Sequence, residues 1–81
     1  GNAEVRFDYQ FLSIAGTLDL FFDGVLLDTL VAPAVEVGDL LTQVLTIDFT
    51  NPNFNAGPNH EWLFRYDGPA GSQLLLDNIQ A

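Results

Sequence analysis

Apolar and polar residues alternate with a period of two along much of this chain, and few folds are compatible with that pattern. In Glu4–Leu12, every second residue from Val5 to Phe11 is apolar or aromatic, and the residues between them are charged or amides. Successive side chains of a strand point to opposite faces, so this pattern predicts a strand with one buried face. Five further segments are predicted as strands: Thr17–Asp23, Val25–Ala32, Leu40–Phe49, Glu61–Asp67 and Gln73–Gln80.

Turn signals separate the predicted strands. Asp23-Gly24 predicts a two-residue hairpin turn of type I′, because both central residues of that turn need positive φ. Pro33 ends the next strand because it has no N–H for the ladder, and Thr50–His60 is the one long loop. Short strands joined in this way predict one all-β domain over residues 1–81, an antiparallel β-sandwich or jelly-roll-like fold of about six strands.

One segment fits two interpretations. The apolar residues of Val37–Leu45 also recur with a helical period, so a helix competes with the strand there. The threonines between Thr42 and Thr50 favour the strand, because β-branched residues are enriched in strands.

The charge of the chain excludes several classes of partner. Eleven acids oppose only Arg6 and Arg65, there is no lysine, and the net charge is −9. No basic patch can form, which excludes nucleic acid and anionic membrane surfaces as partners. No apolar run reaches the roughly 20 residues of a membrane span, so we expect no membrane insertion. Divalent cations are the natural partners of such a surface.

The small size of the chain creates a need for further stabilisation. Hydrophobic residues make up 48% of the 81 residues, which is more than so small a domain buries easily. Cysteine is absent, so the usual staple of small secreted domains is missing. We therefore expect a metal ion or other copies of the chain to supply part of the stability.

Short motifs give the chain a family resemblance. They are Phe7-x-Tyr9-x-Phe11, Gly16-Thr17-Leu18-Asp19-Leu20, Asp23-Gly24, Phe64-Arg65-Tyr66-Asp67-Gly68-Pro69 and Gly71-Ser72-Gln73-Leu74-Leu75-Leu76-Asp77-Asn78-Ile79. With them the chain resembles the C-terminal portion of jelly-roll domains in secreted bacterial proteins, including those with PEP-CTERM sorting tails. It is similar, more distantly, to galactose-binding-like carbohydrate-binding modules.

This resemblance implies an extracellular or cell-surface location. The sorting tail and the N-terminal strands of such domains do not occur in this sequence. We therefore expect either a fragment of a larger jelly roll or a subunit whose neighbour supplies strands, since a domain that lacks strands exposes its sheet edges.

Residues suited to catalysis are scarce. His60 is the one histidine, and His60-Glu61 lacks the second histidine of a helical zinc-protease motif. Gly68–Ser72 does not match a nucleophile elbow, in which the serine lies between the glycines. We expect no enzymatic activity.

Acidic residues on or beside turns are the candidate metal ligands. Oxygen ligands at such positions suit Ca²⁺, and the resemblance to carbohydrate-binding modules implies a structural calcium with Asp77 at the matching position. The alternative is that these residues are solvated acids and turn formers. The candidates are Asp77, Asn78, Asp67, Asp23 and Asp19.

Three aromatic residues are candidates for contact with an extracellular polysaccharide or another subunit: Phe54, Trp62 and Tyr66. Phe54 lies in a polar loop, where it could also plug the end of the core. Trp62 and Tyr66 alternate with Phe64 like one face of a strand. This pattern predicts that the three pack in the core with Phe7, Tyr9 and Phe11.

The two terminal strands are the predicted site of self-association. Neither has a lysine or proline at its middle to protect a free edge. Pairing through an edge supplies backbone hydrogen bonds and buries apolar side chains, and a head-to-tail arrangement that does not close gives a filament. The predicted assembly-edge residues are Phe7, Tyr9, Phe11, Leu74, Leu75 and Leu76.

The sequence as a whole thus predicts a non-enzymatic extracellular structural module that binds other copies of itself through β-edges, as a filament or surface layer. The alternative is a carbohydrate-binding module with a structural calcium.

Overall fold

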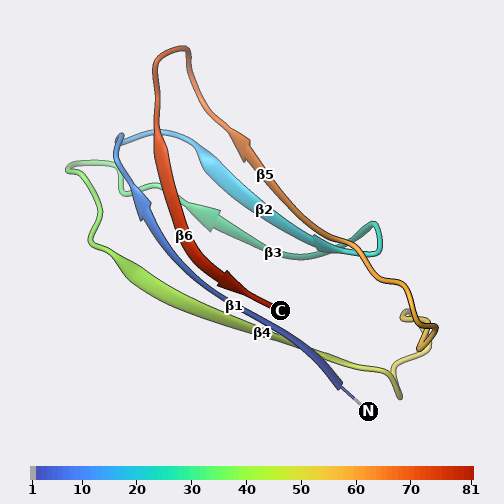
Figure 1. Cartoon of the computed structure of the whole chain (residues 1–81). Coiled ribbons are helices and arrows are strands. Elements are labelled where there is room, and N and C mark those ends of the chain that lie inside the picture. The colour runs from blue at the N-terminus through green and yellow to red at the C-terminus, as the bar shows by residue number, and fades with distance from the viewer. Residues whose placement is uncertain (1) are drawn as a thin grey trace.

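Six strands form two three-stranded antiparallel sheets in the computed structural model, which describes residues 2–81 (Figure 1). The predicted all-β sandwich is therefore confirmed. The rival helix at residues 37–45 is absent, because β4 begins at Leu41 and the described residues contain no helix. The strands are β1 (Asn2–Phe11), β2 (Thr17–Phe22), β3 (Val25–Val31), β4 (Leu41–Asp48), β5 (Trp62–Asp67) and β6 (Leu74–Gln80).

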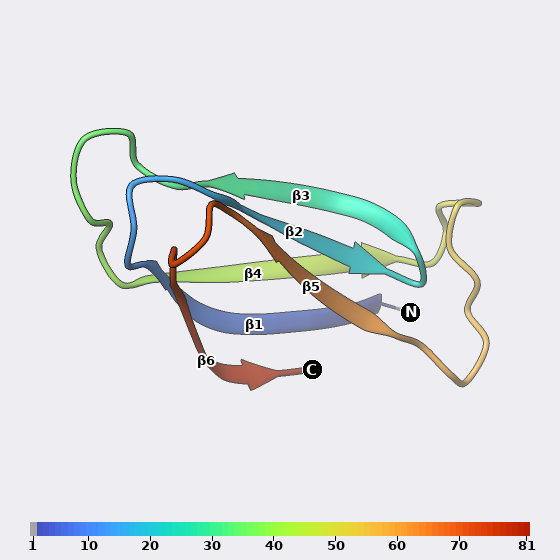
Figure 2. The ribbon, with the colours of Figure 1, turned by 90° about the horizontal axis from the view of Figure 1, so that it is seen from above.

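The chain alternates between two layers, which are seen from above in Figure 2. One sheet has the order β4-β1-β6 and the other has the order β3-β2-β5. Only the β2–β3 connection stays within a sheet, and it is the predicted hairpin, with positive φ at both Asp23 (49°) and Gly24 (81°). Every other connection crosses between the sheets, and β1 and β2 are the two central strands.

The core lies between the sheets and is built from the predicted faces. Every second residue of β2 is buried, and β1 contributes Val5, Phe7 and Phe11. The ring of Phe7 meets the edge of Phe64 at 5.0 Å between centroids. Trp62, Phe64 and Tyr66 all pack against this core as partly buried residues, which confirms their predicted orientation.

Alternation within Leu40–Phe49 places Leu41, Leu45 and Ile47 on one apolar face, and this face enters the core only in part. Ile47 is buried and Leu45 is partly buried, but Leu41 is half exposed. Gln43 also faces the other sheet, where its Nε2 donates to Asp28 Oδ2 of β3 over 3.4 Å. The first half of β4 therefore lies beside a more polar and more open part of the sandwich than its alternation predicted.

Candidate assembly edge

The two sheets leave four strands with a free edge: β4, β6, β3 and β5. This corrects half of the predicted assembly edge. β1 pairs with β4 on one side and β6 on the other, so Phe7, Tyr9 and Phe11 lie in a central strand. Their large side chains belong to the core, in which Phe7 and Phe11 are buried and against which Tyr9 packs. The other predicted strand, β6, is an edge.

Three of the four edge strands carry features that discourage pairing with another chain. In β6, Asp77 is followed by Asn78 at a φ of 52°, and the pairing register with β1 shifts there. β3 has Asp28 beside a register shift, and β5 has Arg65 at its middle. Charges and bulges of this kind are the usual protection of a free edge.

β4 lacks all of these protective features. It pairs with β1 through eight Cα partners, from Asn2↔Asp48 to Tyr9↔Leu41, without a register shift. Its sequence from Leu41 to Ile47 contains no charged residue and no proline. Val44 stands on the outer face and is 44% exposed. β4 is therefore the least protected edge of the sandwich.

Of the predicted β6 contact residues, one is placed outside the core. Leu74 and Leu76 are partly buried against the core cluster, whereas Leu75 points outward and is 40% exposed. Of these three leucines, Leu75 is thus the one that a neighbouring chain would reach.

The candidate calcium ligands do not gather at one point of the structure. Asp19 and Asp23 lie in the β3-β2-β5 half, and Asp77 and Asn78 lie on β6 of the other sheet. Asp67 ends β5. Among residues 2–81, no group of three or more histidine, cysteine, aspartate or glutamate side chains is placed to hold a metal ion.

Two of these candidate ligands, Asp19 and Asn78, instead take part in hydrogen bonds that join strands on the outer faces. Asp19 on the central β2 accepts hydrogen bonds from Thr29 Oγ1 of β3 and Arg65 Nη2 of β5, each at 2.7 Å. Asp8 on the central β1 accepts from Thr42 Oγ1 of β4 at 2.7 Å and Asn78 Nδ2 of β6 at 2.8 Å. Each sheet therefore has one carboxylate that connects its three strands.

These hydrogen bonds favour the charged carboxylates and lower their pKa values. The pKa of Asp19 lies below 3.8 chiefly because Arg65 donates to it, with Thr29 second. The pKa of Asp8 is lowered chiefly by Asn78, with Thr42 second. Both aspartates are thus charged, hydrogen-bonded components of the fold near neutral pH.

The candidate contact aromatics contribute to the interior of the sandwich. Trp62 packs on Phe22 at 4.6 Å between ring centroids, and Phe54 reaches the same ring at 5.9 Å. Tyr66 lies 6.4 Å from Phe11 and donates its hydroxyl to the carbonyl of Ala15 over 3.3 Å. Phe54 therefore plugs one end of the core, which was one of the roles expected for it.

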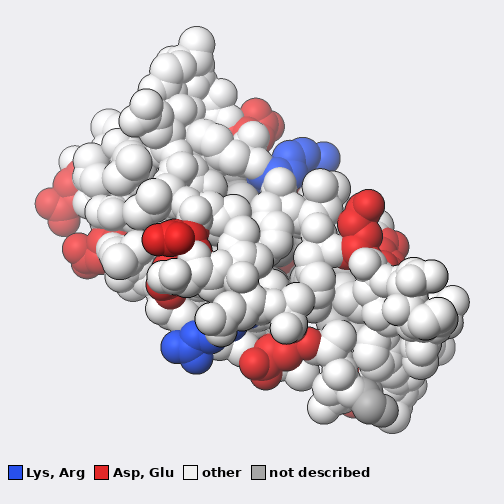
Figure 3. All heavy atoms as spheres, in the orientation of Figure 1, with Lys and Arg blue, Asp and Glu red and all other residues white. Residues whose placement is uncertain are grey.

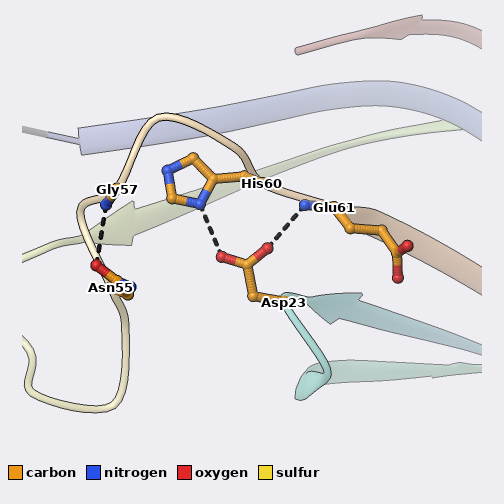
Figure 4. Close-up of polar contacts among 5 residues, drawn as sticks. All are labelled: Asp23, Asn55, Gly57, His60 and Glu61. Carbon is orange, nitrogen blue, oxygen red and sulfur yellow. Dashed lines mark hydrogen bonds and ion pairs between the residues drawn. The ribbon is translucent and has the colours of Figure 1, made fainter.

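A contact that the sequence did not reveal joins His60 to Asp23 (Figure 4). His60 Nδ1 and Asp23 Oδ2 are 2.7 Å apart, and the other Asp23 oxygen accepts from the backbone N–H of Glu61 at 2.7 Å. The imidazole stacks on Phe22 and Phe49, with centroids at 4.9 and 5.2 Å. This cluster fixes the end of the long loop onto the β2–β3 turn.

The fold and the free edges define a class of protein, a small antiparallel β-sandwich with an open sheet edge on β4. Comparison with known proteins found no matching family model, no matching curated protein and no matching solved structure. Within residues 2–81, no helix is long and apolar enough to cross a membrane.

Proposed function

We propose that this chain is a non-enzymatic structural module of the cell exterior that associates with copies of itself through the free edge of β4. The observation that carries the proposal is the contrast among the four edges, of which only β4 has neither charge nor irregularity in its first seven residues. The extracellular location rests on the resemblance to secreted jelly-roll domains.

The physical reason for pairing is the set of unpaired backbone groups along an edge strand. About half of the N–H and C=O groups of β4 face away from β1, and a second strand would satisfy them in a new ladder. Outward side chains such as Val44 would meet their counterparts across that ladder. Buried apolar area contributes roughly 25 cal/mol per Å², which favours the paired state.

Antiparallel pairing of β4 with β4 of a second copy gives one continuous six-stranded sheet and a closed dimer. If the two-fold axis of the dimer passes near Val44, Asp48 at the end of one β4 lies opposite the leucines at the start of the other β4. No two acidic residues of the paired strands then face each other. Pairing of β4 with β6 would instead be head-to-tail and would extend into a filament. The regular ladder of β4 and the interrupted one of β6 favour the dimer.

Sedimentation velocity over a range of concentrations at physiological salt tests the proposal. We expect a species heavier than the 8.9 kDa chain. Val44→Lys should shift the equilibrium toward that single chain, because lysine on an edge opposes pairing. Leu63→Lys is the matched control, since Leu63 is 47% exposed on the edge strand β5 and the charge change is the same.

Three results would distinguish the alternatives. Weakening by Leu75→Lys as well as Val44→Lys would mean that β4 binds β6, as in a filament. A single chain at every concentration would overturn self-association. A single chain whose melting temperature rises with Ca²⁺ would favour the carbohydrate-binding alternative.

A further inference from the structure

A cavity of about 240 Å³ lies at the end of the sandwich where the chain passes from β3 to β4, opposite the His60 cluster. This is the end marked by the green loop at the left of Figure 1. Tyr9 and Phe11 of β1 line it from within the sandwich, and Val37 and Leu41 line it from the loop and the start of β4. Its inner walls are thus aromatic and aliphatic, and polar groups line the rest.

The loop that forms one wall is held in place by β1. The backbone N–H of Gly38 donates to the carbonyl of Phe11 over 3.1 Å, and Gln10 Nε2 donates to the carbonyl of Gly38 over 2.9 Å. These two contacts anchor the loop near the start of β4. The cavity is therefore formed before any ligand arrives, which reduces the ordering cost of binding.

The same loop gives the cavity a charge. Glu36 and Asp39 both line it and both are exposed, so they belong to its solvent side. Neither arginine of the chain is among the lining residues. On the face of the molecule drawn in Figure 3, basic side chains cover only small areas among the acidic and neutral ones. The net charge of −9 adds to the local negative potential.

We propose that this cavity binds a small amphipathic organic cation, with an aromatic or branched apolar body and one ammonium group. The apolar body would contact Tyr9, Phe11 and Leu41, and the ammonium would face the carboxylates of Glu36 and Asp39. For scale, an enclosed apolar cavity of roughly 150 Å³ accommodates benzene; this cavity of about 240 Å³ is open to solvent on one side and is large enough for a phenyl ring with a short chain. A second copy cannot supply an ammonium side chain, because the chain has no lysine.

The cavity lies within a single chain, so binding can be tested without self-association. Low salt is suitable, because the negatively charged copies then repel each other and association is weakened. The probes are phenethylammonium, the neutral 2-phenylethanol and the anion phenylacetate, which have similar size. Backbone amide NMR shifts of Val37, Gly38 and Leu41 report binding, and Gly57 at the opposite end serves as the reference. We expect the cation to bind most tightly and the anion least tightly.

Variants assign the binding to the cavity and to its carboxylates. Glu36→Gln and Asp39→Asn should each weaken phenethylammonium roughly two- to fivefold, the range of an exposed ion pair, and leave 2-phenylethanol unchanged. Glu4→Gln makes the same charge change on the exposed outer face of β1 and should leave both probes unchanged. Val37→Trp should fill the cavity and abolish binding of both.

The proposal is overturned if the cation and the neutral probe bind equally, or if Glu4→Gln weakens the cation as much as Glu36→Gln does. It is also overturned if binding survives Val37→Trp in a variant whose amide spectrum remains that of the folded protein. Any of these results would leave the proposal for β4 untouched, since that proposal is measured by sedimentation.

Discussion

Phe22 holds together the end of the sandwich that carries the long loop. It is fully buried, and its ring lies within 6.0 Å, between centroids, of four other aromatic rings: Phe49, Phe54, His60 and Trp62. The alternation of β2 places Phe22 on the same face as Leu18 and Leu20, but it contains no information about which loop residues cover it. That depends on how residues 50–61 return to the β2–β3 turn.

Phe22→Ala should lower the free energy of unfolding by about 3–5 kcal/mol, through lost transfer energy and a cavity. Trp62 is the only tryptophan, so its fluorescence follows urea unfolding and should also shift to the red in the folded variant. Phe21→Ala is the control, because Phe21 lies on the outer face of the same strand, with the Arg65 guanidinium carbon 5.0 Å from its ring centre. Equal losses in the two variants would contradict the role given to Phe22.

The β2–β3 hairpin and the long loop are joined through one carboxylate. The pKa of Asp23 is lowered from 3.8, chiefly by the backbone N–H of Glu61 and next by the His60 side chain. A group whose pKa is lower in the folded state stabilises the fold above its unfolded value. This contribution is therefore present above about pH 3.8 and is lost as the pH falls through the folded pKa.

Asp23→Asn tests this coupling between hairpin and loop. Asparagine also tolerates the positive φ of 49° at this position, so the turn should persist while the charge is removed. We expect the variant to be less stable than the parent at pH 7, and the difference in urea midpoint to shrink as the pH falls below 3.8. A difference that stays constant from pH 7 to pH 3 would contradict the assignment.

At the scale of elements, the sequence predicts strands better than it predicts their neighbours. All six strands were expected at nearly their observed positions, because alternation and turn residues are local signals. The position of β1 between β4 and β6 was not expected, since the pairs Val5↔Leu45 and Tyr9↔Leu76 join residues distant in sequence. Alternation identifies the buried face of a strand and does not identify its partner.

The candidate sites follow the same rule. Asp19 and Asn78 were expected as calcium ligands because both are polar residues near turns. Their actual partners, Arg65 and Asp8, lie on other strands and become neighbours only through the sheet order. His60 offered one local signal, a lone histidine between a polar loop and an aromatic strand. Its partner Asp23 lies 37 residues earlier.

At the scale of the whole molecule, the free energy of self-association depends on two opposing contributions. Pairing of the apolar edges favours it, and repulsion between like-charged copies opposes it. Each copy carries −9 at pH 7, and the sequence pI is about 4.1. Salt screens charges separated by more than about 8 Å at physiological ionic strength and about 30 Å at 0.01 M. Backbone ladders and buried apolar contacts at β4 are short-ranged and respond much less to salt.

Association should therefore strengthen as NaCl rises from 10 to 500 mM at pH 7, and it should also strengthen as the pH falls from 7 toward 4.5. Below about pH 3.8 the trend should end, because Asp8, Asp19, Asp23 and Asp48 all have lowered pKa values and their loss of charge destabilises the folded subunit. Sedimentation velocity measures association across both the salt series and the pH series, and Trp62 fluorescence measures the unfolding expected below about pH 3.8. Dissociation by added salt would instead indicate ion pairs through Arg6 or Arg65, and it would contradict an interface held by the uncharged residues of β4.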